Sequence, residues 1–306
     1  MQTDNKSKKR IPATLELVSP RGFCAGVERA IRVVEQALAT HGAPVYVLGG
    51  IVHNELVIGR LAEKGVVFVK SLDAADAAKP LILPAHGVAK DVEAAARKRH
   101  AVVIDATCPL VLNVHSDLKR LEQMGAEIIV IGDPKHDEVI ATRGQIDGPS
   151  ICIRKIGDLD ASGLAFDAKI GVISQTTLNA DYVLDLCGQL AEKFPNMIKF
   201  DGRPMGNICN VTKKRQAAMR AAAKGSDLAV VFGSATSSNS VELCREARNS
   251  GAKNAILILD KSQMDWSLVG PGSRVVATAG ASTPEDLVQD WAAEFRRRFA
   301  QGGHTR

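Results

Sequence analysis

Short apolar runs rich in β-branched residues recur along the whole chain, and amphipathic segments separate many of them. Continuously apolar runs of this kind are typical of strands buried on both faces of a parallel sheet. The alternation of strands with helical segments, such as residues 91–99 and 211–225, predicts α/β architecture. We expect twelve strands, near residues 13–18, 44–48, 66–69, 80–83, 101–104, 126–131, 150–154, 169–173, 198–200, 228–232, 255–259 and 274–278.

Twelve strands are many for one open sheet, because open sheets rarely exceed about ten strands. The strands divide naturally into three groups of four. A chain of 306 residues, 45% of them hydrophobic, is long enough for several cores. We therefore expect three α/β domains with mainly parallel four-stranded sheets, at 12–107, 108–205 and 206–284, followed by a C-terminal helix and tail at 285–306. The first ten residues and the tail after Phe299 are expected to be disordered.

The composition argues against two classes of protein. No apolar run reaches the roughly 18 residues that span a membrane. The N-terminus is polar and basic without an apolar core, so we expect a cytoplasmic protein. The net charge is +5, but only 4% of residues are aromatic and no recognised module is present, so we expect no nucleic-acid binding. The basic clusters fit solubilising surface charge, and an acidic redox partner or a phosphorylated substrate would also suit them.

Three of the six cysteines lie in loops that follow predicted strands, where open α/β sheets bind ligands. Cys24, Cys108 and Cys209 each have Gly, Pro or Asn beside or near them, and one falls in each expected domain. No CxxC pair occurs. Three converging thiolates would suit either an iron–sulfur cluster or zinc, and a missing fourth ligand would leave a position open to substrate. Cys152, Cys187 and Cys244 fall in a strand and two helices and are expected to pack in the core.

Three of the seven histidines also follow predicted strands, in loops that contain glycine. His53, His86 and His136 in equivalent positions indicate metal ligation or anion binding. No HExxH motif is present, so a zinc-peptidase helix is not indicated. We expect the remaining histidines to be structural or superficial, with His115 on a helix and His41, His100 and His304 at the surface.

Two helix starts are rich in hydroxyl and amide groups. Ser237, Ser238, Asn239 and Ser240 form the first, in "GSATSSNSVEL". Helix N-termini favour anions, but Asn239 and Glu242 also resemble a capping box, and for this loop alone the cap is favoured. Ser282 or Thr283 before Pro284 supplies the second start. Together with the loop histidines they fit a phosphate or diphosphate site, whereas the absence of P-loop and GxGxxG patterns argues against nucleotide binding.

Glu138 follows His136 by two residues in "KHDEV". A carboxyl group at a buried anionic site could have a raised pKa and deliver protons. The alternative is an acidic residue that interacts with the dipole at a helix N-terminus.

Taken in order, several of these segments resemble a known family. The chain contains, in this order, "RGFCAGVERAI", "VHNELV", "AHGV", "DATCPLV", "SQTTL", "NIC…RQ", "SSNS" and "AGAS", and the resemblance covers about residues 15 to 284. This set of motifs is similar to that of the 4-hydroxy-3-methylbut-2-enyl diphosphate reductases, the last enzymes of the methylerythritol phosphate route to isoprenoids. The resemblance implies three α/β domains in a cloverleaf around a central [4Fe–4S] cluster. Air oxidation would be expected to convert that cluster to [3Fe–4S].

The resemblance also implies roles for single residues. Cys24, Cys108 and Cys209 would hold the cluster, and its fourth iron would bind the substrate hydroxyl. Glu138 would be the proton source, Thr176 would hydrogen-bond near that hydroxyl, and Gln175 would line the pocket. The diphosphate would be bound by His53, His86, His136, Ser237, Ser238, Asn239 and Ser282. Ferredoxin or flavodoxin would supply two electrons, and the products would be isopentenyl and dimethylallyl diphosphate.

The chain departs from the family pattern at two places. It has "GDPKHDEV" where "GHPEHPEV" or a similar segment is expected, and Lys214 stands where an Asn usually precedes the Arg-Gln pair. Neither change removes a proposed ligand. Two other interpretations stay open at this point: an iron–sulfur sensor without enzymatic activity, and a zinc enzyme acting on a phosphorylated metabolite.

Overall fold

The structure is a computed structural model that describes residues 12–160, 163–200, 203–204 and 207–299. The predictions of disorder for the first ten residues and for the tail, and the placement of His304, lie outside these residues. The chain divides into two compact units. We call Phe23–Lys214 the middle unit, and the residues up to Gly22 together with those from Arg215 onward the N/C unit.

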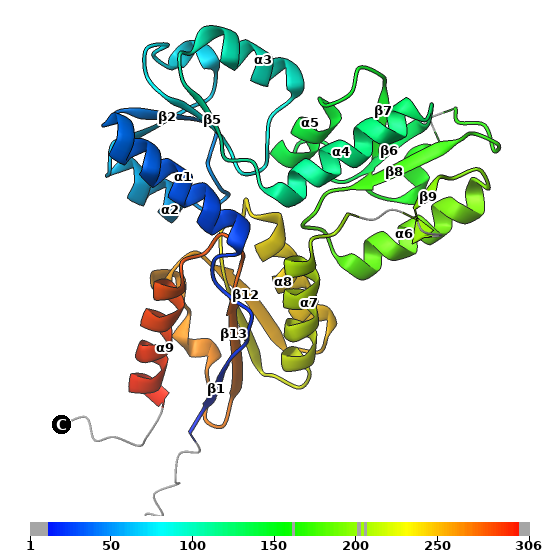
Figure 1. Ribbon diagram of the computed structural model, residues 1–306. Coiled ribbons are helices and arrows are strands. Elements are labelled where there is room, and N and C mark those ends of the chain that lie inside the picture. Colours follow the sequence, from blue (N-terminus) through cyan, green and yellow to red (C-terminus); the bar gives the residue numbers. More distant parts are fainter. Residues whose placement is uncertain (1–11, 161–162, 201–202, 205–206, 300–306) are drawn as a thin grey trace, which may run out of the picture. The chain divides into compact units, whose positions relative to one another are not determined.

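The middle unit contains two parallel sheets (Figure 1). The first has the strand order β3-β2-β4-β5, with every neighbouring pair parallel. Its strands are β2 (Val45–Leu48), β3 (Val66–Val69), β4 (Leu81–Leu83) and β5 (Val103–Asp105). The helices that accompany them are α1 (Ala25–His41), α2 (Glu55–Ala62) and α3 (Lys90–Arg99).

The second sheet of the middle unit has three strands in the order β7-β6-β8, again all parallel. They are β6 (Glu127–Ile131), β7 (Ser150–Ile153) and β8 (Ile170–Ser174), and the helices are α4 (Pro109–Gln123), α5 (Asp137–Arg143) and α6 (Ala180–Lys193). Two short strands, β9 (Lys199–Phe200) and β10 (Arg203–Pro204), pair antiparallel with each other.

The N/C unit contains the third parallel sheet, in the order β1-β13-β11-β12. Its strands are β1 (Thr14–Leu17), β11 (Leu228–Phe232), β12 (Asn254–Ile258) and β13 (Arg274–Ala279). Helices α8 (Ser238–Asn249) and α9 (Glu285–Phe299) belong to this unit, and α7 (Asn210–Ala223) crosses the boundary between the units. Four short 3₁₀ helices complete the described elements, at Leu72–Ala74, Ile156–Leu159, Lys261–Gln263 and Trp266–Leu268.

The predicted α/β class is confirmed, and each of the twelve expected strands is present within two residues of its expected ends. The grouping into fours was wrong for the middle sheet, because the expected strand at 198–200 pairs only with β10. The grouping also placed the first strand in the domain at 12–107. In the structure β1 pairs instead with β13, and Figure 1 shows the two strands side by side. The domain boundaries themselves stay a prediction.

The apolar runs form strands because both faces of each sheet are covered. In β11 and β8 every residue is buried, which explains why these strands read as continuous apolar runs instead of alternating ones. In the N/C unit, Trp291 on α9 is fully buried against Phe232 and Phe295. Burial of an aromatic side chain of this size is worth about 2–3 kcal/mol, so Trp291 contributes to holding α9 against its sheet.

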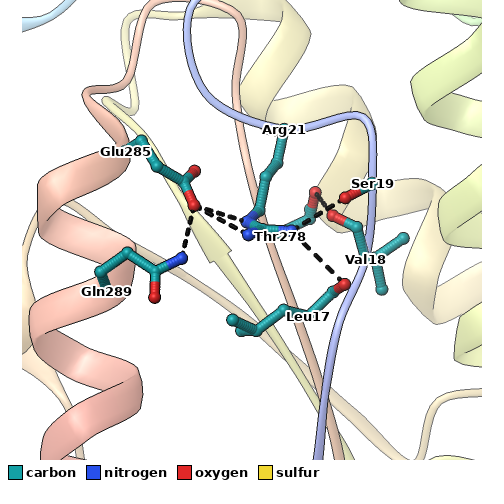
Figure 2. A network of polar contacts seen from close by, with 7 residues as sticks. All are labelled: Leu17, Val18, Ser19, Arg21, Thr278, Glu285 and Gln289. Atoms are coloured by element: carbon teal, nitrogen blue, oxygen red, sulfur yellow. Dashed lines mark hydrogen bonds and ion pairs between the residues drawn. The ribbon is translucent and has the colours of Figure 1, made fainter.

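The loop after β1 is fixed to α9 by a polar network within the N/C unit (Figure 2). The Arg21 guanidinium donates to Glu285 Oε1 from Nε at 3.0 Å and from Nη2 at 2.8 Å. Gln289, one turn further along α9, donates to the same carboxylate oxygen. Gly22 has φ +77°, and a β-carbon there would stand 3.3 Å from Glu285 Oε2. The loop that leads to Cys24 is therefore held in one conformation two residues before that cysteine.

Among the described residues, no helix is both long enough and apolar enough to cross a lipid bilayer.

Candidate functional site

Each of the three sheets reverses its strand order between two neighbouring strands. The reversal lies between β2 and β4, between β6 and β8, and between β11 and β13. Open α/β sheets bind ligands in the crevice beyond the carboxyl ends of such a pair. Histidines follow β2, β4 and β6, Gln175 and Thr176 follow β8, and the hydroxyl-rich loops follow β11 and β13. The polar residues singled out in the sequence therefore stand at the switch point of each sheet.

Three of the sequence-predicted histidines come together in the middle unit. The rings of His53 and His86 stack with centroids 5.0 Å apart, and those of His53 and His136 are tilted with centroids 4.8 Å apart. His53 and His86 come from one sheet and His136 from the other. Asn54, the next residue after His53, caps α2 by accepting from Leu56 and Val57 N–H, which fixes the loop. The three histidines of this cluster therefore come from the switch points of both sheets of the middle unit.

Burial lowers the pKa of all three histidines of the cluster, which favours their uncharged form. Burial, followed by the neighbouring His53 and His136, lowers the pKa of His86 to about 3. Burial, followed by His53, lowers the pKa of His136 to about 4, and burial also lowers the pKa of His53. Neutral imidazoles can each donate one N–H group to an anion. Because an anionic ligand favours the charged form, its binding would raise these pKa values again.

His136 has a defined tautomer when neutral. It caps α5, and its Nδ1 accepts a hydrogen bond from the Glu138 N–H at 3.2 Å. The ring proton must then lie on Nε2. That nitrogen is buried and has no hydrogen-bond partner among the described residues. A buried donor without a partner points to a ligand, because such groups are otherwise costly.

Glu138 is a buried carboxyl, and both of its oxygens bond Thr176. Its Oε1 accepts from the Thr176 N–H at 2.6 Å and its Oε2 bonds the Thr176 hydroxyl at 3.0 Å. Burial raises the pKa of Glu138, and the two bonds from Thr176 act in the opposite direction. Glu138 lies in the first turn of α5, as the helix-dipole interpretation expects, and it is also buried, as the proton-source interpretation requires. The carboxyl can therefore carry a proton at a higher pH than an exposed glutamate.

Gln175 precedes Thr176 and makes hydrogen bonds of its own. Its Oε1 accepts from the Asp133 N–H at 3.2 Å, and its Nε2 donates to the Thr177 hydroxyl at 3.0 Å. Gly132 lies against it, because a β-carbon there would stand 3.3 Å from Gln175 Cβ. Gln175 thus joins the loops after β6 and β8, and these are the loops that carry Glu138 and Thr176.

The three loop cysteines occupy equivalent positions, each directly before a helix. Cys24, Cys108 and Cys209 precede α1, α4 and α7. In each case the cysteine carbonyl accepts the N–H of the residue four positions on, at 2.9, 3.0 and 3.0 Å. The partial positive charge of a helix N-terminus stabilises thiolate, which is the form that binds metals. Cys209 does not follow a strand of a parallel sheet, in contrast to the expectation, but its N–H donates to the Thr176 carbonyl at 3.1 Å.

Gly26 leaves a space between two of these sulfurs. A β-carbon on Gly26 would stand 2.7 Å from Cys108 Sγ and 3.8 Å from Cys24 Sγ. Burial raises the pKa of Cys108, the N–H groups of Leu110 and Val111 lower it, and charge on Cys24 and Cys209 raises it further. Three thiolates at these positions would repel one another. A bound cationic centre would relieve that repulsion, so these donors and this space fit a thiolate-ligated metal group.

The other cysteines and histidines lie mostly as expected. Cys187 and Cys244 are buried on helices and Cys152 is half-buried in β7, which confirms their place in the core. His115 is buried on α4 and contacts Gly87, as a structural residue would. His100 was expected at the surface, but it is 5% exposed, at the C-terminal end of α3.

In the N/C unit, the cap of α8 is Ser237 and not Asn239. Ser237 Oγ accepts from the Ser240 N–H at 3.4 Å and from the Ser240 hydroxyl at 3.0 Å. The expected capping box was therefore wrong. Asn239 lies in the first turn, and Glu242 instead pairs with Arg245 at 2.5 Å. Asn239 Nδ2 is buried and lacks a partner among the described residues, which leaves it available to a ligand.

The two hydroxyl residues of the loop after β13, Ser282 and Thr283, are adjacent in the sequence and have different contacts. Thr283 is engaged in the fold, since its hydroxyl donates to the Phe232 carbonyl at 3.0 Å. Ser282, next to it, is buried at the switch point. The Thr283 hydroxyl is therefore engaged in the fold, and the role of Ser282 in binding a ligand stays a prediction.

The contacts of Asp137 and of Arg215 were not predicted from the sequence. Asp137 places a carboxylate oxygen 3.9 Å from His86 Nε2, and its position between His136 and Glu138 was the available signal. Arg215 is buried and donates to the carbonyls of Ala279 and Gly22, at 2.8 and 2.7 Å. Its partners are remote in sequence, so no local pattern could have indicated them. A cavity of about 540 Å³ adjoins the histidine cluster, with His86 and Asp137 in its wall.

Comparisons with known proteins agree with one another. The profile of the LytB protein family matches residues 15–296. The 4-hydroxy-3-methylbut-2-enyl diphosphate reductase of Rhizobium etli is 41% identical over 94% of this chain and 87% of its own length. The reductase of the same name from Hyphomonas neptunium is 43% identical over 94% and 91%.

Two solved structures are also similar. The E-1-hydroxy-2-methyl-but-2-enyl-4-diphosphate reductase of Plasmodium falciparum matches with a TM-score of 0.87 and 32% identity, over 92% of this chain and 87% of the other. A second structure, an (E)-4-hydroxy-3-methyl-but-2-enyl diphosphate reductase described as the terminal enzyme of the non-mevalonate pathway, matches with a TM-score of 0.67 and 27% identity. It covers 94% of this chain and 100% of the other.

Proposed function

The chain belongs to the LytB protein family, and we propose that it catalyses the reductive dehydroxylation of 4-hydroxy-3-methylbut-2-enyl diphosphate. It is an oxidoreductase of the non-mevalonate isoprenoid pathway. In the reaction the allylic C–O bond breaks and the hydroxyl leaves as water. Two electrons and two protons enter, one proton joining the leaving hydroxyl and the other a carbon of the allyl group. The products are isopentenyl and dimethylallyl diphosphate.

The observation that carries this function is the gathering of three kinds of group in one unit. Cysteines at three helix starts, three neutral histidines and the Glu138–Thr176 pair all belong to the middle unit. Thr176 links two of these groups, because it bonds Glu138 through its N–H and hydroxyl and Cys209 through its carbonyl. Metal ligands, an acid and anion-binding donors are the parts that this reaction requires.

Cys24, Cys108 and Cys209 are the residues that would hold a [4Fe–4S] cluster. Their positions at helix N-termini, and the absence of a side chain at Gly26, support this assignment. When bound, such a cluster with three protein ligands supplies electrons and an open, Lewis-acidic iron position for the substrate hydroxyl. Loss of the unprotected iron in air would leave [3Fe–4S].

Glu138 is the proton source in this mechanism. A general acid must be protonated at the working pH, and burial raises the pKa of Glu138 in that direction. Two hydrogen bonds from Thr176 fix the orientation of the Glu138 carboxyl group. The direction in which its acidic proton points is therefore also fixed. The Thr176 hydroxyl can both donate and accept a hydrogen bond. Thr176 can therefore also bond the substrate hydroxyl and pass a proton to it from Glu138.

The histidines bind the diphosphate far from the reacting carbon. His53, His86 and His136 each offer a ring N–H, and the His136 Nε2 proton has no protein partner among the described residues. Binding energy gained there fixes the position of the allyl group relative to Glu138. The roles of Ser237, Ser238, Asn239 and Ser282 in binding the diphosphate stay a prediction, which the buried Asn239 amide supports.

The electrons come from a small acidic carrier of the ferredoxin or flavodoxin type. The net charge of +5 favours association with such a partner. Lys213 and Lys214 are exposed in the first turns of α7, close in sequence to Cys209. Reversal of both charges should lower the rate with the carrier and flatten its salt dependence, whereas turnover with a small-molecule reductant should be unchanged.

Replacement of the three loop cysteines tests whether they hold the metal group that the proposed reaction requires. Cys24→Ser, Cys108→Ser and Cys209→Ser should each lose most iron and nearly all turnover under anaerobic conditions. Cys187→Ser, in the core of the same unit, is the matched control and should keep both. Full iron content and turnover in all three variants would refute the assignment.

A further inference from the structure

Asp137 brings a carboxylate to the edge of the histidine cluster. One imidazole nitrogen each of His53 and His86 and one oxygen of Asp137 all lie within 4.8 Å of one another. His86 Nε2 and Asp137 Oδ2 are 3.9 Å apart. Around zinc, with bonds of about 2.0–2.2 Å, neighbouring tetrahedral ligands lie roughly 3.3–3.5 Å apart. Small side-chain movements would therefore bring these three donors onto one ion.

The kind of donor selects the kind of ion. Two imidazoles and one carboxylate suit the first-row transition metals, whereas calcium and magnesium prefer shells built from oxygen. The histidines are uncharged at neutral pH and so need not lose a proton to bind a metal. A set of three protein ligands leaves at least one position for water, as in catalytic zinc sites.

The site has access to solvent and room for additional ligands. The Asp137 side chain is 57% exposed and that of His86 is 11% exposed. The cavity of about 540 Å³ has both residues in its wall. An ion can therefore enter without local unfolding, which a site enclosed in the core would require.

We propose that His53, His86 and Asp137 bind a divalent transition-metal ion of the zinc class in the substrate-free protein, and that this ion competes with the diphosphate substrate. The competition rests on the proposed function, because it requires the same histidines to bind the diphosphate. The metal site itself rests only on the three side chains. In a cell, such a site would make the enzyme sensitive to free zinc.

The test uses the anaerobic holoenzyme without substrate. Zinc is titrated from a metal buffer, and bound zinc and iron are measured after gel filtration. We expect one zinc per chain with the iron content unchanged. X-ray absorption at the zinc edge should show nitrogen and oxygen ligands at about 2.0–2.2 Å, and no sulfur at about 2.3 Å.

Two variants make the test specific. Asp137→Asn should weaken zinc binding at least tenfold, since even the outer-shell partners of a metal site are worth about 10–100-fold in affinity. Asp147→Asn is the control, because Asp147 is also exposed and paired with a cation, Lys90, but lies outside the cluster. Its zinc affinity should equal that of the parent chain. At a fixed free zinc concentration, KM should rise with kcat unchanged, and Asp137→Asn should need at least ten times more zinc for the same rise.

Three results would overturn the proposal. They are zinc bound by sulfur, equal zinc affinity in Asp137→Asn and the parent chain, and no stoichiometric binding. A fall in kcat at constant KM would overturn the competition. The proposed function is judged separately, by turnover measured without zinc. A chain that binds zinc but never turns over would refute the function, and one that turns over but binds no zinc would refute only the metal site.

Discussion

Thr176 binds both carboxylate oxygens of Glu138, with its backbone N–H 2.6 Å from Oε1 and its hydroxyl 3.0 Å from Oε2. The two residues follow neighbouring strands, β6 and β8, at the point where the strand order of their sheet reverses. The carbonyl of Thr176 in turn accepts from the Cys209 N–H. One residue thus joins the proposed acid to a proposed cluster ligand, and the first predictions concern this pair.

Glu138→Gln should retain the fold and lose most turnover. The amide keeps the size of the side chain and its bond from the Thr176 N–H, but it cannot deliver a proton. General acid catalysis is worth about 10²–10⁴-fold, so we expect a loss of kcat in that range. Iron content and substrate binding should be unchanged, and both are measured on the same preparation. Activity equal to that of the parent chain would remove Glu138 from the mechanism.

Thr176→Val should move the pH dependence of kcat to higher pH. The Thr176 hydroxyl lowers the pKa of Glu138, so its removal raises that pKa further. Activity that needs the protonated acid falls as pH rises through this pKa, and the falling limb of the profile should therefore shift upward. Thr177→Val is the neighbouring control, because the Thr177 hydroxyl bonds Gln175 and not Glu138. A limb that stays in place in Thr176→Val would contradict the assignment of that limb to Glu138.

Gly26→Ala should impair cluster assembly while sparing the fold. The added β-carbon would stand 2.7 Å from Cys108 Sγ, which no real contact tolerates. We expect iron content well below that of the parent chain. Gly188→Ala, in the interior of α6 with open space around it, is the control and should gain about 0.5–1 kcal/mol of stability from helix propensity. Equal iron content in the two variants would show that the space beside Gly26 is not needed.

The histidine cluster should make the protein less stable in mild acid. The pKa of His86 is about 3 in the folded chain against an ordinary value of 6.5, so the unfolded chain binds more protons between these values. Stability is then fully present above about pH 6.5 and falls as the pH drops toward 3. Between pH 7 and 5 we expect His86 to account for a loss of about 2 kcal/mol.

Chemical unfolding of the anaerobic protein at the two pH values measures this loss. His86→Gln should reduce the difference between pH 7 and 5 by about the same 2 kcal/mol. His41→Gln, at the exposed end of α1, should leave the difference as it is in the parent chain. An unchanged difference in His86→Gln would mean that the ring is charged in the folded protein.

The sequence predicted the elements of the fold well because their signals are local. Buried parallel strands are continuously apolar, and this pattern located β6, β8 and β11 within one residue. Pairing depends on remote partners, so the union of β1 with β13 was missed. β10 was missed because its two residues pair only with β9 and carry no apolar run.

In the site, too, features with a local signal were predicted and features that depend on residues remote in sequence were missed. The loop histidines and cysteines were found because chemistry-bearing residues at strand and helix ends are visible in the sequence. The bonds of Arg215 to Gly22 and Ala279 depend on contacts 193 and 64 residues away. His100 was placed at the surface because it ends a basic stretch, yet tertiary packing buries it. The neutral state of the histidine cluster follows from burial and mutual proximity, which no local pattern encodes.

Anaerobic turnover tests the central claim most directly. The protein is purified without oxygen, its absorption spectrum is recorded, and 4-hydroxy-3-methylbut-2-enyl diphosphate is added with reduced methyl viologen. We expect a brown protein that oxidises two equivalents of viologen for each substrate consumed and releases isopentenyl and dimethylallyl diphosphate. A brown protein without turnover, or a colourless protein that contains zinc in place of iron, would contradict the proposed function.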